Sequence, residues 1–309
     1  MAVRRRRDIW DVIVIGGGIA GLTAAWHASR RGLSVAIFET QPGCGGQVAT
    51  VNTLDDWPAT GPVSGVELAA ALAERLHIEG VGIFYESVVS VLEKGDLRQV
   101  VGERNTLRGK RIIAAAGARL KTLGVPGEED LRGKGVSQCA HCDGGFFKDQ
   151  DVVVVGGGDA ALQEAIVLTE YCRTVNIVVR SGLRARRAYV DRADGKTNVK
   201  FIWDQTVAAV NGKDGVTGVQ LRNMKDGKLT DLACSGVFAF VGVEPNTGFL
   251  ADAVKRDGSG RVVTAAQCRT SDPSIFAIGA LRSGYGGDLV SAAGEAALAI
   301  ATAAEELRI

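Results

Sequence analysis

The chain has 309 residues, which is enough for two domains of ordinary size. Its formal net charge is +1, so the protein as a whole offers no field that would attract nucleic acid or an anionic membrane. Glycine is unusually common, at 41 residues or about 13% against roughly 7% in average proteins. This composition is typical of tight strand-to-helix turns against which another group packs closely.

The N-terminal run of residues 4–7 is four arginines, which we interpret as a solvated end rather than a polyanion-binding segment. The run does not begin a signal peptide, because an apolar strand pattern and a glycine loop follow it directly. No apolar stretch reaches the ~18 residues of a transmembrane helix. We therefore expect a cytoplasmic protein with neither a membrane nor a nucleic-acid partner.

The first expected βαβ unit follows this run. Residues 9–15 form an apolar strand pattern, residues 19–31 a helical pattern that ends at Gly32, and residues 33–39 a second strand that ends on an acid. The glycines between the first strand and the helix predict a dinucleotide loop. A pyrophosphate would lie on the helix N-terminus, and the acid would accept hydrogen bonds from ribose. The residues expected to hold this dinucleotide are Gly16, Gly18, Ile19, Ala20, Gly21 and Glu39.

A second unit repeats the pattern in the middle of the chain. Residues 151–155 form a strand, residues 159–171 a helical pattern, and residues 174–179 another strand that is followed by arginines. An arginine at this place suits the 2′-phosphate of NADPH, whereas an acid would suit an unmodified ribose. A solvated basic loop is the alternative. The residues expected to bind the second nucleotide are Gly156, Gly158, Asp159, Ala160, Ala161, Arg180 and Arg184.

Two crossings between domains are expected, near residues 117–125 and 243–248. The predicted fold class is α/β, with two Rossmann-like, three-layer ββα dinucleotide-binding domains, the second inserted into the first. Residues 1–117 and 246–309 would form the outer domain, and residues 118–245 the inserted one.

Cys139 and Cys142 are separated by two residues and lie between the two glycine loops. Thiols at this spacing can close a small disulfide and can lower the pKa of one of them. Half of a zinc site is one alternative, but no second ligand pair is present in the sequence, so no metal is expected. An inert structural pair is another alternative. Asp143 follows the second cysteine, and it would either shuttle the proton that thiolate formation releases or cap a helix.

These motifs resemble those of the low-molecular-weight thioredoxin reductase family, and the resemblance covers nearly the whole chain. The most specific segment is residues 139–144, Cys-Ala-His-Cys-Asp-Gly, between two dinucleotide loops. The other matching segments are residues 45–47 (Gly-Gly-Gln), 56–58 (Asp-Trp-Pro), 156–161, 240–242, 245–247 and 275–279.

The resemblance implies a homodimeric flavoprotein disulfide oxidoreductase with FAD in the outer domain and NADPH in the inserted one. Electrons would pass through FAD to the disulfide and on to thioredoxin or a thioredoxin-like protein. By position, Cys142 resembles the thiol nearest the flavin, Cys139 the thiol that attacks the partner, and Asp143 the acid. The resemblance adds five cofactor-binding residues, which are Gly46, Gln47, Asp56, Gly117 and Gly279.

Three of the segments that differ from the family pattern leave other electron donors open. Residues 178–180 read Val-Val-Arg where the family has His-Arg-Arg, Ala280 replaces an Asp that bonds the flavin ribityl chain, and residues 287–288 read Gly-Asp in place of Arg-Gln. NADPH is the expected donor. The alternatives are a disulfide oxidoreductase that uses ferredoxin or a second flavin in the inserted domain, an oxygen-using dithiol oxidase, and a non-enzymatic redox sensor.

Overall fold

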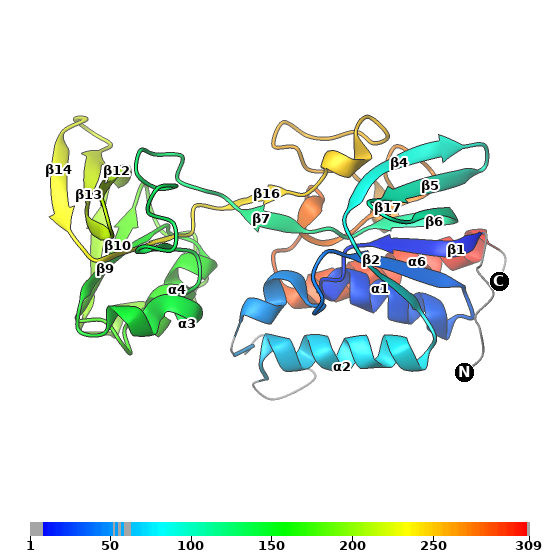
Figure 1. Cartoon of the computed structure of the whole chain (residues 1–309), viewed down its shortest axis with the longest axis horizontal. Helices are drawn as coiled ribbons and strands as arrows, with labels where there is room; N and C mark the ends of the chain where they lie inside the picture. The colour runs from blue at the N-terminus through cyan, green and yellow to red at the C-terminus, as the bar shows by residue number, and fades with distance from the viewer. Residues whose placement is uncertain (1–8, 52, 55–56, 59–62, 308–309) are drawn as a thin grey trace. The chain divides into compact units, whose positions relative to one another are not determined.

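The computed structural model describes residues 9–51, 53–54, 57–58 and 63–307. The chain divides into two compact units (Figure 1), one formed by Met1–Arg119 with Glu244–Ile309 and the other by Leu120–Val243. From sequence, the crossings are expected after residues 117 and 245. Each unit has its own sheets and its own hydrophobic core.

The unit that contains the N-terminal strand is built on a seven-stranded sheet in the order β3-β2-β1-β6-β5-β4, with β17 beside β6. The pairs β1·β2, β1·β6, β2·β3 and β6·β17 are parallel, whereas β4·β5 and β5·β6 are antiparallel. The strands are β1 (Trp10–Ile15), β2 (Val35–Glu39), β3 (Gly82–Tyr85), β4 (Val88–Lys94), β5 (Leu97–Gly102), β6 (Thr106–Ala114) and β17 (Ile275–Ala277).

Both faces of this sheet are covered, which explains why β1 is apolar at every buried position. Val12 and Val14 belong to the core formed with the helices, whereas Ile13 and Ile15 belong to the core formed with β4 and β5. The result is three layers around the parallel strands. Helices cover one face, and the antiparallel end of the same sheet, β4 and β5, packs over the other (Figure 1). The helical segments are α1 (Ile19–Arg30), α2 (Gly65–Ile78), α6 (Leu289–Glu306) and the 3₁₀ turns η1 (Gly46–Thr50), η3 (Gly248–Leu250), η4 (Ala266–Cys268) and η5 (Gly279–Leu281).

The second unit repeats this plan on a five-stranded parallel sheet in the order β11-β10-β9-β15-β8, with the antiparallel sheet β12-β13-β14 packed on one face. Helices α3 and α4 pack on the other face. The elements are β8 (Val136–Ser137), α3 (Ala140–Asp143), η2 (Gly144–Phe147), β9 (Asp151–Val155), α4 (Asp159–Leu168), β10 (Thr174–Val179), α5 (Arg187–Asp194), β11 (Val199–Trp203), β12 (Gln205–Gly212), β13 (Val216–Asn223), β14 (Leu229–Ala233) and β15 (Gly236–Ala239).

The two segments that connect the units pair with each other as a two-stranded ribbon of β7 (Ala118–Leu120) and β16 (Val243–Pro245) (Figure 1). Arg119 and Glu244 form an exposed ion pair across this ribbon, at 2.9 Å.

The predicted α/β class with two Rossmann-like dinucleotide-binding folds is confirmed. One expected helix is shorter than its pattern suggested. It ends at Leu168 rather than at residue 171, and the Thr169 hydroxyl donates to the Ile166 carbonyl at 2.6 Å just after its last turn. No helix in the described ranges combines the length and the apolarity that a membrane span requires.

Arg98 and Asp272 form a buried bidentate ion pair that joins β5 to the turn before β17. The two N···O distances are 2.8 and 3.0 Å, and the side chains are only 9% and 12% exposed. We expect Arg98→Ala to lower the free energy of unfolding by about 3 kcal/mol, because a carboxylate would remain buried without its partner.

Denaturant unfolding of both variants, followed by circular dichroism, measures this loss. The matched control is Arg30→Ala, which removes the ion pair between Arg30 and Glu79. The Arg30 side chain is 62% exposed, so this substitution should lower the free energy of unfolding by less than about 1 kcal/mol. Equal losses in the two variants would contradict the role assigned to burial.

Candidate functional site

The first glycine loop joins β1 to α1, and its glycines have two different structural roles. A Cβ on Gly16, where φ is +108°, would lie 2.4 Å from the Ala115 carbonyl oxygen, and a Cβ on Gly21 would lie 1.8 Å from the Gly16 oxygen. These two glycines therefore permit close backbone packing. A Cβ on Gly18 would meet only the Gly45 oxygen, at 3.9 Å, so the space in front of Gly18 is open and can accept a ligand.

The N-terminus of α1 offers backbone N–H groups to that space. Gly18 is the N-cap, it makes no side-chain capping bond, and the first turn contains no acidic residue. The amide of Leu22 is bonded to the Gly18 carbonyl, so the amides of Ile19, Ala20 and Gly21 precede the first helical bond. Free amides and the helix dipole together favour a phosphate at this position.

Glu39 lies at the end of β2 with its carboxylate turned toward the same loop. It is only 7% exposed, and its Oε2 accepts the Gly17 amide at 2.5 Å. Its Oε1 accepts the Gln41 amide at 2.9 Å and the Thr40 hydroxyl at 3.1 Å. A carboxylate oxygen can accept more than one bond, so Oε2 retains capacity for a ribose hydroxyl.

Segments distant in sequence meet this loop. The Gly45 amide donates to the Gly17 carbonyl at 2.7 Å, and a Cβ on Gly46 would lie 3.3 Å from the Gly18 Cα. A Cβ on Gly279, which follows β17, would lie 3.2 Å from the Cβ of Ala20. The fold therefore brings Gly46 and Gly279 beside the predicted phosphate site.

The remaining residues that the resemblance adds lie near the ribbon or outside the described residues. Gln47 donates its side-chain amide to the Ala118 carbonyl. Gly117 has φ of +62° and accepts the Asn246 amide at 3.0 Å. Asp56 lies outside the described residues, as do residues 4–7.

The second glycine loop, between β9 and α4, has the same construction. A Cβ on Gly156 would lie 2.3 Å from the Phe240 oxygen, whereas a Cβ on Gly158 would meet nothing within 4 Å. Asp159 is the first residue of α4, and its carboxylate accepts the backbone amide and the guanidinium of Arg186, both at 2.7 Å. Ala160 and Ala161 follow in the first turn of α4, the first exposed and the second buried.

The arginine segment folds back over this loop, since the Arg184 amide donates to the Gly157 carbonyl at 2.7 Å. The side chains of Arg180 and Arg184 are exposed and take no part in the ion pairs found among the described residues. Val179 is only 1% exposed, so the position at which the family has a further arginine is part of the core in this chain. Two arginines, rather than three, can therefore face a nucleotide phosphate.

Cys139 and Cys142 form a disulfide at the start of α3, with a Cα–Cα distance of 5.3 Å. Cys139 is the N-cap of α3, and its Sγ accepts the Cys142 amide at 3.1 Å. Asp143 is the last residue of α3 and the N-cap residue of the 3₁₀ turn η2, where its side chain makes no capping hydrogen bond. Within the described residues, no three His, Cys, Asp or Glu side chains gather into a possible metal site.

The four other cysteines are free thiols, and their environments disfavour reaction. Burial raises the pKa of Cys172 to about 11, of Cys234 to about 12 and of Cys268 to about 11. Burial also raises the pKa of Cys44, with a further contribution from the Glu39 charge. A thiol with a raised pKa is a poor nucleophile at neutral pH, so thiol chemistry is concentrated at Cys139 and Cys142.

Two carboxylates near these sites were not predicted from the sequence. Glu295, on α6, accepts the Gly279 amide at 2.7 Å and pairs with Arg282, which donates to the Thr264 hydroxyl at 2.9 Å. It stands beside the position where Ala280 replaces the family's Asp. The available signal was a single acid in the apolar middle of α6. The other carboxylate is Glu164 on α4. It contacts α3, the short helix that carries the Cys139–Cys142 disulfide and is called the redox helix below.

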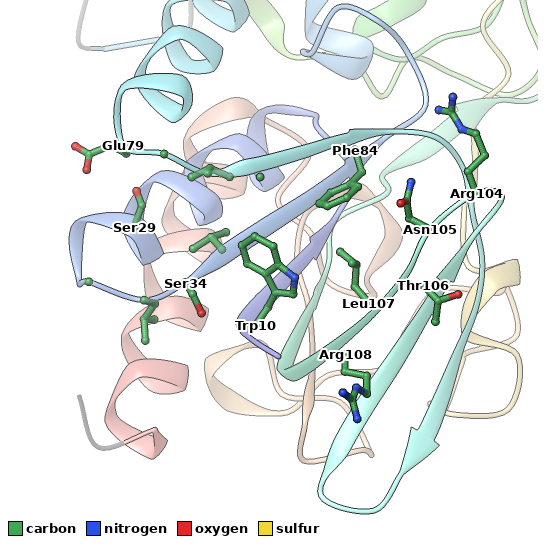
Figure 2. Close-up of a pocket in the computed structure, with 16 residues that line it drawn as sticks. Trp10, Ser29, Ser34, Glu79, Phe84, Arg104, Asn105, Thr106, Leu107 and Arg108 are labelled. Carbon is green, nitrogen blue, oxygen red and sulfur yellow. The ribbon is translucent and has the colours of Figure 1, made fainter. Parts of the chain in front are cut away.

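A hollow of about 1110 Å³ lies in the unit that contains β1, and Figure 2 shows its lining. Trp10, Phe84 and Leu107 form its apolar centre, and Arg104 and Arg108 lie toward its edges. Trp10 is the first residue of β1, whereas the glycine loop follows the last. The Trp10 side of the hollow is therefore at the opposite end of the strand from the candidate dinucleotide site.

Two glycine loops and one disulfide helix define a class of protein, the two-domain dinucleotide-binding disulfide oxidoreductases. The chain belongs to the pyridine nucleotide-disulphide oxidoreductase family, whose model matches residues 10–299. It is 37% identical to a thioredoxin reductase of Treponema pallidum (strain Nichols) over 297 residues, 96% of each chain. It also resembles the crystal structures of the Lactococcus lactis thioredoxin reductase (35% identity, TM-score 0.93, 96% and 98% of the chains) and the T. acidophilum thioredoxin reductase (31%, 0.92, 98% and 100%).

The different roles of the loop glycines give a testable contrast. We expect Gly18→Ala to weaken flavin binding at least about tenfold while changing the unfolding free energy of the flavin-free protein by less than about 1 kcal/mol, because its methyl group would occupy only the ligand space. Gly21→Ala should destabilise the protein by about 2 kcal/mol or more, because its methyl group would overlap backbone. Flavin absorbance per chain and denaturant unfolding measure the two effects. Normal flavin binding by Gly18→Ala would show that the phosphate lies elsewhere.

Proposed function

We propose that the protein is a flavoprotein that reduces the disulfide of thioredoxin or a thioredoxin-like protein, with NADPH as the electron donor. The observation that carries the proposal is the Cys139–Cys142 disulfide on a chain with two open glycine loops. Thioredoxin reductases among its relatives support the choice of partner.

The loop after β1 fits FAD on its own geometry. The open space in front of Gly18 and the amides of α1 would hold the pyrophosphate, and Glu39 would hold the ribose. Bound FAD supplies the two-electron chemistry that links a hydride donor to a disulfide. The open face of Gly158 and the exposed Arg180 and Arg184 support NADPH at the second loop.

The dithiol chemistry follows from the positions of three side chains. The Cys139 thiolate attacks one sulfur of the partner disulfide, forming a mixed disulfide and releasing the other partner sulfur as a thiolate. Cys142 then attacks the Cys139 sulfur, which closes the Cys139–Cys142 disulfide and frees the partner as a dithiol. The Cys142 amide stabilises negative charge on the Cys139 Sγ. Asp143, beside Cys142, supplies or accepts the proton that each exchange requires.

The surface beside the dithiol suits a protein partner. Phe146 is 78% exposed, four residues after Cys142, and large exposed aromatic side chains are common anchors of protein interfaces. We also propose a cytoplasmic homodimer. The dimer rests on the family resemblance, and four free thiols among six cysteines suit a reducing compartment.

The cysteine roles predict distinct variant behaviour. Cys139→Ser and Cys142→Ser should each reduce turnover with thioredoxin by about 10³-fold or more, because disulfide exchange requires both sulfurs. Flavin content should be unchanged, since neither cysteine belongs to the glycine loop. With a single-cysteine thioredoxin supplied as its mixed disulfide with thionitrobenzoate, only the variant that retains Cys139 should form a mixed disulfide with thioredoxin, releasing thionitrobenzoate as the leaving thiolate. Trapping through Cys142 instead would reverse the assignment.

An anaerobic NADPH titration with bound flavin counted beforehand tests the donor. We expect one flavin per chain and full bleaching at about two equivalents of NADPH, because the flavin and the Cys139–Cys142 disulfide each take up two electrons. Arg180→Ala and Arg184→Ala should each raise KM for NADPH about tenfold without raising KM for NADH. The matched control is Arg187→Ala, whose guanidinium is already paired with Asp191. A chain with two flavins, or one that NADPH does not bleach, would favour a different donor.

A further inference from the structure

Glu164 of α4 lies against the redox helix and is bonded to its first residue. Its Oε2 accepts the Ala140 amide at 2.6 Å, and Ala140 itself is 0% exposed. The Ala140 methyl group packs in the same buried cluster as Leu162, Ala165 and Leu168. A buried amide without an acceptor is costly, so Glu164 satisfies a donor that the position of Ala140 creates.

The bond is significant because the redox helix is too short to hold its own shape. Helix α3 has four residues, a single turn, and an isolated turn of this length is unstable. The disulfide closes this turn in the oxidised protein. Besides the disulfide, two side chains from outside α3 accept backbone amides of the turn, the Ser137 hydroxyl from Cys139 at 3.0 Å and the Glu164 carboxylate from Ala140. An ionised acceptor forms the stronger kind of bond.

The environment of Glu164 disfavours the charged form of its carboxyl group. Burial raises its pKa, while the hydrogen bond from the Ala140 amide and the electrostatic interaction with His141 act in the opposite direction. A partly buried carboxyl group beside a packed core requires specific partners. Both of these partners belong to the redox helix, so Glu164 and the dithiol turn form one structural unit.

We propose that Glu164 is a positioning residue for the dithiol, holding the Cys139–Cys142 turn in disulfide-forming geometry after the disulfide has opened. It thereby sets the equilibrium between the disulfide and the dithiol. This inference deepens the proposed function and rests on it. The reaction that reports it needs no partner protein: dithiothreitol is oxidised to its cyclic disulfide, and two electrons and two protons pass to Cys139 and Cys142.

The experiment equilibrates the full-length, flavin-loaded protein with mixtures of reduced and oxidised dithiothreitol and counts the two thiols by trapping and mass spectrometry. Glu164→Met keeps the length of the side chain but has no oxygen, whereas Glu164→Gln keeps a carbonyl acceptor and removes the charge. We expect Glu164→Met to shift the equilibrium about tenfold toward the dithiol, because a turn without the bond to Ala140 loses more conformational entropy when the disulfide closes. Glu164→Gln should stay within about threefold of the unaltered protein, because its carbonyl can still accept the Ala140 amide. Glu170→Gln, at an exposed position just after α4, is the control and should show no shift.

Two results would overturn the proposal. An unchanged equilibrium in Glu164→Met, with normal circular dichroism and flavin content, would make Glu164 a packing residue only. Equal shifts in Glu164→Met and Glu164→Gln would assign the effect to charge rather than to the bond with Ala140. Failure of the proposed function has a different signature, which is an unaltered protein whose Cys139–Cys142 pair does not open and close reversibly with dithiothreitol.

Discussion

The close approach of backbone to backbone at the ends of β1 and β9 is the constraint on which the rest of the structure depends. At Gly16 and at Gly156 a side chain would overlap a carbonyl oxygen of a neighbouring segment. Because these glycines let the chain turn sharply, each following helix begins directly at the sheet edge with its amides toward open space. The same turn therefore completes the packing of each unit and forms its candidate anion site.

The dithiol depends on the second of these arrangements. Helix α4 begins at the glycine loop and, within its next turn, presents Glu164 to the redox helix. The element proposed to receive a nucleotide phosphate therefore also bonds to the Cys139–Cys142 turn. A four-residue helix has little stability of its own, so contacts with α4 and with the core around Ala140 stabilise its geometry.

Much of the fold could be predicted because its signals are local. Both βαβ units, their glycine loops and the paired cysteines have sequence patterns that follow directly from backbone geometry. Glu39 could be predicted for the same reason, since its place at the end of β2 brings it to the loop. The arginine segment was harder, because only the fold shows that Val179 is buried while Arg180 and Arg184 are exposed.

Contacts between residues distant in the chain required the tertiary structure. Glu295 reaches the Gly279 amide from a different element, and Glu164 reaches Ala140 across 24 positions. Neither carboxylate belongs to a motif, because each accepts a backbone amide that any residue type could provide. Spacing and residue type were enough to predict the class of chemistry. A disulfide between nearby cysteines and a glycine turn that can accept a phosphate both depend on residues that are neighbours in sequence. Which partly buried acids support these sites was decided only by packing, because burial and the direction of an amide arise when separate elements meet.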